Sequence, residues 1–127
     1  QIGSRFAVAT ESSAHPLFKQ RVYETPEGGT MLALKKLAPT RLIKNKFYEQ
    51  VSTLENQGGS PEDLTKLLGK GRAKKGIFEG DLQEGELEIG QISSMLIQEE
   101  TVAAILTDLL QDYQDRLTEL TQSKYTF

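Results

Sequence analysis

The longest regular feature of the sequence is an apolar pattern near the C-terminus that repeats every three or four positions. It covers residues 99–120 and comprises Val102, Ile105, Leu106, Leu109, Tyr113, Leu117 and Leu120. This spacing places the apolar side chains on one face of an α-helix, which has about 3.6 residues per turn. We expect that face to dock onto the rest of the same fold, and a dimer or partner helix is the alternative.

Two more helices are predicted in the first half of the chain. Ser12 and Ser13 suit the N-cap of a helix over residues 14–23. Pro39 suits the first turn of a helix over residues 39–57, because proline lacks the amide hydrogen that a helix leaves unpaired there. The apolar residues of that second helix recur every three to five positions: Leu42, Ile43, Phe47, Val51 and Leu54.

The rest of the chain is expected to alternate short helices with loops. Ser60-Pro61-Glu62-Asp63 is a helix start, since serine caps the amides and the acids face the positive end of the helix dipole. Residues 30–35 predict a strand, and residues 69–90, with six glycines, predict ordered loops. A short helix over residues 90–97 follows. The predicted fold is therefore mostly α with one or two short strands.

The composition excludes several classes of site. The chain has no Cys and one His, so a disulfide, a thiol nucleophile and a thiolate or multi-histidine zinc site are excluded. No apolar run approaches the roughly 18–20 residues of a membrane span, and the start lacks the pattern of a signal peptide. We therefore expect a cytoplasmic protein without a membrane partner. A sequence pI of about 5.2 and the absence of recognition motifs predict no nucleic-acid binding.

Charge is distributed unevenly along the chain. Residues 1–75 carry 13 basic and 7 acidic side chains, whereas residues 76–127 carry 2 basic and 11 acidic ones. The asymmetry suits either a basic face for a phosphate, nucleotide or acidic partner, or two halves that attract each other. We favour the second interpretation.

Three features contain residue types found in functional sites but lack the residue spacing or the partners that such sites require. Residues 69–76 are basic and glycine-rich but match neither phosphate-loop pattern, so a helix C-cap with a solvated basic turn is favoured. Five carboxylates in residues 79–88 lack the spacing of a calcium loop. We interpret them as an acidic loop facing the basic segment. His15 has no recognisable Ser or Asp partner and is expected to be a surface or capping residue.

Five short motifs resemble those of one enzyme family. They are Ile2-Gly3-Ser4-Arg5-Phe6, Glu11-Ser12-Ser13-Ala14-His15-Pro16, Pro39-Thr40-Arg41-Leu42-Ile43-Lys44-Asn45-Lys46-Phe47, Gly76-Ile77-Phe78-Glu79-Gly80-Asp81 and Gly90-Gln91. Together they resemble the C-terminal part of the nitronate monooxygenase family, formerly 2-nitropropane dioxygenases, which includes the FMN-dependent enoyl-acyl-carrier-protein reductase II. The family usually has Thr where Ser4 stands, so the hydroxyl is kept.

The resemblance implies a fragment of a (β/α)₈ TIM barrel. Residues 1–25 would hold the end of the last barrel strand at Ile2-Gly3-Ser4, a phosphate-site loop and the following helix. Residues 26–127 would form a helical extension that caps the barrel. A complete barrel needs about 250 residues. We therefore expect the 127 residues alone to be inactive.

The resemblance also implies a flavoprotein. Its FMN phosphate would contact Gly3 and Ser4, because the loops after the last strands of such barrels bind phosphate. Gln91 would lie on the flavin side. The implied oxidoreductase either oxidises an alkyl nitronate with O₂ or passes a hydride from NAD(P)H through FMN to an enoyl thioester. The family's catalytic His lies upstream, so no catalytic or metal-binding residue is assigned. A stand-alone helical interaction module, with a homodimer left open, is the alternative of another class.

Overall fold

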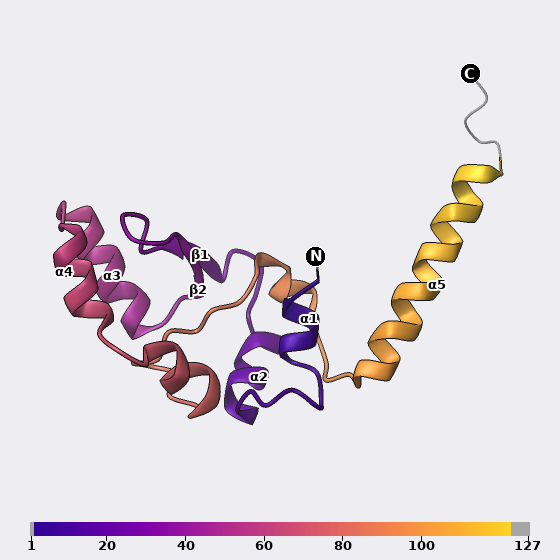
Figure 1. Ribbon diagram of the computed structural model, residues 1–127, viewed down its shortest axis with the longest axis horizontal. Helices are drawn as coiled ribbons and strands as arrows, with labels where there is room; N and C mark the ends of the chain where they lie inside the picture. Colours follow the sequence, from indigo (N-terminus) through magenta and orange to yellow (C-terminus); the bar gives the residue numbers. More distant parts are fainter. Residues whose placement is uncertain (1, 123–127) are drawn as a thin grey trace, which may run out of the picture.

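The computed structural model describes residues 2–122 and is mostly helical with two strands, as the sequence predicts (Figure 1). The elements are α1 (Ser4–Ala7), α2 (Pro16–Tyr23), β1 (Thr30–Ala33), β2 (Thr40–Ile43), α3 (Lys46–Asn56), α4 (Pro61–Leu68), a π-helical turn η1 (Lys74–Phe78), a 3₁₀ turn η2 (Gln91–Met95) and α5 (Val102–Thr121). In Figure 1, α3 and α4 lie at one end, α1 and α2 lie near the middle, and α5 projects from the other end.

The two strands form an antiparallel pair in which Thr30 faces Ile43 and Ala33 faces Thr40. The strand at residues 30–33 agrees with the sequence-based prediction, but the predicted helix over residues 39–57 was wrong at its start. Residues 40–43 are a strand, and the helix α3 begins at Lys46.

The reason for that error lies in two neighbouring apolar residues. Leu42 and Ile43 are each 1% exposed, and successive side chains of a strand point to opposite faces. They therefore enter two separate cores, a pattern that resembles a helical stripe in the sequence alone.

The two cores divide the chain into packed regions joined by β2. The first core holds Val8, Ala14, Phe18, Val22, Ile43, Leu87, Ile89 and Leu96. The second core holds Ala33, Leu34, Leu42, Phe47, Val51 and Leu64. Leu87 and Ile89 of the first core belong to the glycine-rich segment of residues 69–90. This segment therefore packs back against α2.

Helix caps agree with the sequence in one helix and differ in another. Ser60 caps the start of α4 as predicted, where it forms a capping box with Asp63, and Gly69 ends that helix with φ of 64°. At α2 the cap is His15, whose Nδ1 accepts a hydrogen bond from the amide of Leu17 at 3.2 Å. Ser12 and Ser13 precede the helix by several residues and do not cap it.

The expected strand end at Ile2-Gly3-Ser4 is not formed. Residues 2 and 3 are irregular, and Ser4 already begins the short helix α1. A barrel strand is held by hydrogen bonds to strands on either side, and no residue between 2 and 122 supplies such a neighbour to this segment.

The unequal charge distribution produces pairing within the chain, as predicted. Seven of the eight ion pairs among the described residues join a base from residues 1–75 to an acid from residues 76–127. Arg5 makes two of them, to Glu100 and to Asp108, each at 2.7 Å. These two contacts fix the first turns of α5 against α1.

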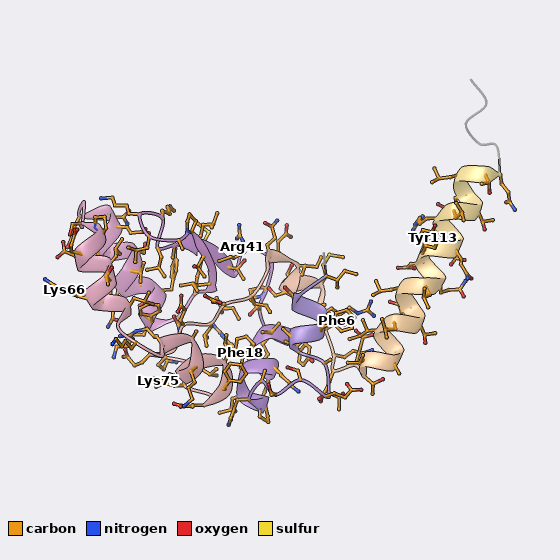
Figure 2. All side chains as sticks on the ribbon, viewed as in Figure 1. Phe6, Phe18, Arg41, Lys66, Lys75 and Tyr113 are labelled. Carbon is orange, nitrogen blue, oxygen red and sulfur yellow. The ribbon has the colours of Figure 1, made fainter. Side chains whose placement is uncertain are left out.

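The apolar face of α5 does not dock onto the rest of the chain, contrary to our expectation. Ile105 is its only buried residue within the described range. Leu106, Tyr113, Leu117 and Leu120 are between 48% and 71% exposed, and Tyr113 lies well out on the projecting helix (Figure 2). Along most of its length this helix has no neighbour among residues 2–122.

Among the described helices, none combines the length and the apolar character needed to cross a bilayer.

Candidate functional site

A hydrogen bond joins two motifs that are 86 positions apart. The amide of Gly90 donates to Oγ of Ser4 at 3.0 Å. A Cβ atom on Gly90 would lie 2.5 Å from that oxygen, so a side chain at position 90 would force the two segments apart. The contact therefore places the Gly3-Ser4 and Gly90-Gln91 motifs beside each other.

A shallow depression of about 570 Å³ lies at this junction. It is lined by Gly3, Ser4, Ala7, Pro39, Thr40, Arg41, Glu88, Ile89 and Gly90. A Cβ atom on Gly3 would meet nothing within 4 Å, so a ligand has room to approach the backbone there. Ser4 uses its oxygen to accept from Gly90 and keeps its hydroxyl hydrogen to donate. Open backbone beside a hydroxyl donor suits an oxyanion such as phosphate.

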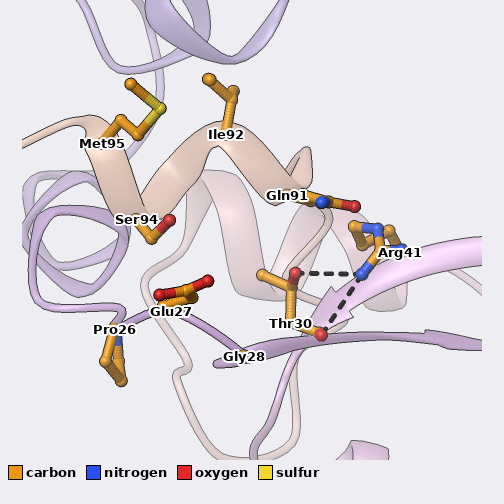
Figure 3. Close-up of a pocket in the computed structure, with 9 residues that line it drawn as sticks. All are labelled: Pro26, Glu27, Gly28, Thr30, Arg41, Gln91, Ile92, Ser94 and Met95. Carbon is orange, nitrogen blue, oxygen red and sulfur yellow. Dashed lines mark hydrogen bonds between the residues drawn. The ribbon is translucent and has the colours of Figure 1, made fainter.

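A larger cavity of about 790 Å³ adjoins this depression (Figure 3). It is lined by Pro26, Glu27, Gly28, Thr30, Arg41, Gln91, Ile92, Ser94 and Met95. Gln91 thus lines the larger cavity, whereas Gly3 and Ser4 line the smaller depression. The three residues singled out in the sequence lie at two adjoining sites rather than one.

Arg41 lines both sites and was missed by the sequence-based assignment. Its Nη1 donates to the carbonyl oxygen of Thr30 at 3.3 Å and to the Thr30 hydroxyl at 3.2 Å. Thr30 is buried, so it anchors the guanidinium firmly. The predicted helix over residues 39–57 gave no role to Arg41. Arg41 lies within the family motif of residues 39–47, and that position could have marked it as a site residue.

The other sequence candidates have structural roles. Lys74 pairs with Glu79 at 3.2 Å and Lys75 with Asp81 at 3.0 Å, so the acidic loop faces the basic segment as predicted. Arg72 donates to main-chain carbonyl oxygens at the end of α4. No three His, Asp or Glu side chains between residues 2 and 122 converge as a metal site would require.

One buried carboxyl group, that of Glu86, has a raised pKa. Glu86 is 6% exposed, and burial raises its pKa to about 7, with a further contribution from the nearby Glu88 carboxyl. Glu86 lines neither the depression nor the larger cavity. We therefore treat it as a pH-dependent element of the fold and not as a site residue.

Comparison with known proteins agrees with the resemblance of the motifs. The sequence profile described as nitronate monooxygenase matches residues 1–112. The chain is 33% identical over 113 residues to a Bacillus subtilis (strain 168) protein named "Probable nitronate monooxygenase", covering 88% of this chain and 32% of that protein. It thus spans about a third of the length of the curated relative.

Solved structures share the fold. The structure of FabK from Thermotoga maritima matches with a TM-score of 0.83 and 26% identity, covering 94% of this chain and 38% of that chain. Its M276A mutant matches with a TM-score of 0.74 and 22% identity, covering 94% and 34%. The arrangement of elements described above is therefore found within a longer chain. On the extent of the profile match, the protein belongs to the nitronate monooxygenase family.

Proposed function

We propose that the chain forms the C-terminal part of an FMN-dependent oxidoreductase that acts on a nitronate. The observation that carries this proposal is the Ser4–Gly90 hydrogen bond, which joins two of the family motifs at an open depression. The family match over residues 1–112 supports a flavin cofactor and a nitronate substrate for this proposal. The proposal includes a TIM barrel completed by chain outside these 127 residues.

Within this proposal, Gly3 and Ser4 contact the flavin phosphate. The open backbone at Gly3 admits the phosphate, and the Ser4 hydroxyl donates to one of its oxygens. Amides in the first turn of a helix have no partners within that helix and favour an anion. When bound, the flavin supplies the redox chemistry, and this chain holds its phosphate end. Gln91 lies next to that end, at the wall of the larger cavity.

Reduction of an enoyl thioester with NAD(P)H is the second candidate function. The larger cavity favours it, because about 790 Å³ beside the flavin-phosphate depression exceeds what a small alkyl nitronate requires. The two candidates share the flavin and differ in the second substrate. A helical interaction module without flavin is the remaining alternative, and the exposed face of α5 is the feature that suits it.

The test uses the natural protein that carries this sequence. We expect it to be purified with FMN and to consume O₂ with propyl nitronate, while NAD(P)H with crotonyl thioester gives no turnover. The opposite substrate preference would favour the second candidate. A protein of 127 residues that binds no flavin would contradict both.

Two substitutions test the phosphate contact. Ser4→Thr keeps the hydroxyl and should retain FMN, whereas Ser4→Asp places a negative charge beside the phosphate and should weaken FMN binding at least tenfold. Ser13→Asp adds the same charge at an exposed serine outside the depression and serves as the matched control. Equal FMN content in Ser4→Asp and Ser13→Asp would remove Ser4 from the phosphate site.

A further inference from the structure

The short helix α1 carries the Ser4 hydroxyl but contributes no buried side chain to either core. None of its four residues is buried, and a helix this short gains little stability from its own hydrogen bonds. In the described part of the chain, two polar contacts hold its N-terminal end to distant segments. Ser4 accepts a hydrogen bond from the amide of Gly90, and Arg5 binds Glu100 and Asp108. The position of the Ser4 hydroxyl therefore depends on these contacts.

Arg5 engages two carboxylates at once. Its Nε and Nη2 donate to the two carboxylate oxygens of Glu100 at 2.8 and 2.7 Å, and its Nη1 lies 2.7 Å from Oδ2 of Asp108. A guanidinium held in this way cannot rotate without breaking a hydrogen bond. The side chains of Arg5 and Glu100 are only 22% and 25% exposed. The hydrogen bonds from Arg5 lower the pKa of the Glu100 carboxyl, so both groups are charged at neutral pH.

The segment that binds Arg5 is itself held in place. The carbonyl oxygen of Glu100 accepts hydrogen bonds from the amide and the hydroxyl of Thr10, at 2.9 and 3.2 Å. The Glu11 carboxylate accepts from the amide of Val102, the first residue of α5, at 2.9 and 3.1 Å. Arg5 therefore joins α1 to a segment that is fixed through its main chain as well as through its side chain.

Arg5 does not line the depression in which the phosphate is proposed to bind. Gly3 and Ser4 line that depression, whereas Arg5 lines a separate groove of about 350 Å³ together with Glu100 and Asp108. One guanidinium and two carboxylates give this cluster a net charge of −1, so it does not attract an anion. Any influence of Arg5 on a ligand at Ser4 is therefore exerted through the backbone of α1.

From this arrangement we infer that Arg5 is a positioning residue for the phosphate contact of Ser4. Arg5 touches no ligand. Its two-point contact with Glu100 holds α1 so that the Ser4 hydroxyl lies at the depression beside the open backbone of Gly3. This role rests on the proposed flavin function and extends it, because the segment that precedes α5 becomes a determinant of cofactor affinity.

The test compares FMN with riboflavin in the natural protein that carries this sequence, because the two ligands differ only by the phosphate. The ratio of the riboflavin and FMN dissociation constants measures what the phosphate contributes to binding. Arg5→Ala should lower this ratio about fivefold, as for one lost hydrogen bond, and change riboflavin affinity by less than about twofold. Arg5→Lys should recover part of the loss, because the ammonium keeps one contact with Glu100. The ³¹P signal of bound FMN should move in Arg5→Ala.

Two further variants separate positioning from a direct effect of charge. Glu100→Gln removes a negative charge from the region of the phosphate, so a direct charge effect would tighten FMN binding. Positioning predicts the opposite, because a neutral amide holds Arg5 less firmly than a carboxylate does. FMN should then bind more weakly while riboflavin affinity is unchanged. In a Ser4→Ala background, Arg5→Ala should add no further loss, because the hydroxyl that it positions is gone.

Arg72→Ala is the matched control. It also removes an arginine that bridges separate segments, and it lies outside the depression. It should lower the melting temperature and leave both the ratio and the ³¹P signal unchanged. If Arg5→Ala matches Arg72→Ala in both readouts, or if Glu100→Gln tightens FMN binding, Arg5 has no positioning role. FMN binding by the parent makes either result specific to Arg5, whereas a parent protein that binds no FMN would contradict the proposed flavin function and this role together.

Discussion

The amide of Gly90 donates a hydrogen bond to Oγ of Ser4 across 86 positions of sequence, and the approach leaves no space for a side chain at position 90. Gly90 has φ of −69°, which any residue adopts. Glycine is therefore required here by contact distance and not by backbone conformation.

That contact predicts a specific coupling between the two positions. Gly90→Ala should destabilise the chain by about 1–3 kcal/mol, because its new methyl group meets the Ser4 hydroxyl. Ser4→Ala should cost about 1 kcal/mol for the lost hydrogen bond. The double variant Ser4→Ala with Gly90→Ala should cost less than the sum of its single changes, since removing Oγ makes room for the methyl group. Urea unfolding of the four chains measures the coupling, and strict additivity would contradict the contact.

Arg72 is expected to be the most sensitive basic residue of the second core region. Its guanidinium donates to the carbonyl oxygens of Leu67, Leu68 and Glu84 at 2.8–2.9 Å and lies 4.5 Å from the ring centroid of Phe47.

Arg72→Ala should therefore destabilise the fold by about 2–3 kcal/mol, because three carbonyl groups lose a charged donor. Arg72→Lys should recover little of this, since one ammonium cannot reach all three oxygens. Lys70→Ala is the control, as Lys70 is exposed two residues away and should change stability by less than about 0.5 kcal/mol. Chemical denaturation that ranks Lys70→Ala with Arg72→Ala would exclude this role for the guanidinium.

Local signals in the sequence predicted much of the fold. The helix start at Ser60, the strand at residues 30–33 and the facing of the acidic loop toward the basic segment each depend on residues that are close in the chain. Contacts of this kind depend on the types and spacing of neighbouring residues, so they can be predicted from a single sequence.

The features that the sequence did not predict depend on contacts between residues far apart in the chain. Leu42 and Ile43 look helical until the two cores on either side of β2 are known. Arg41 became a site residue only when η2 was brought across from position 91. The apolar repeat of α5 predicted a helix correctly but could not say which surface covers it, because a periodic stripe specifies a face and not its neighbour.

Stability should fall as the pH rises from about 4.5 to about 7. Burial raises the pKa of Glu86 from its ordinary value of 4.5 to about 7, so in this interval the folded chain holds a proton that the unfolded chain has released. The contribution of Glu86 is fully present below pH 4.5 and is lost as the pH passes 7.

The variant Glu86→Gln isolates this effect. It cannot ionise, so its stability should lack this fall and should exceed that of the parent chain above pH 7 by more than it does at pH 5. Glu88→Gln, at the exposed neighbour, should leave most of the fall in place. Parallel thermal melts at pH 5 and pH 8 provide the comparison. Identical pH dependence in the parent and Glu86→Gln chains would assign the change to other groups.

The C-terminal helix should respond very differently at two of its apolar positions. Ile105 is fully buried, whereas Leu117 is 48% exposed and lies two turns or more beyond the ion pairs of Arg5. Ile105→Ala should therefore destabilise the attachment of α5 by about 2–4 kcal/mol, because it leaves a cavity. Leu117→Ala should change the stability of this chain by less than about 0.5 kcal/mol.

Hydrogen exchange distinguishes this picture from one in which α5 is already covered. Helices derive most of their stability from packing of an apolar face, so amides beyond Leu110 should exchange much faster than those near Ile105. The contrast should persist at every protein concentration if the chain is monomeric. If a second copy covers the exposed face, protection beyond Leu110 should rise with concentration, and Leu117→Ala should abolish that rise while Ile105→Ala weakens the helix at all concentrations.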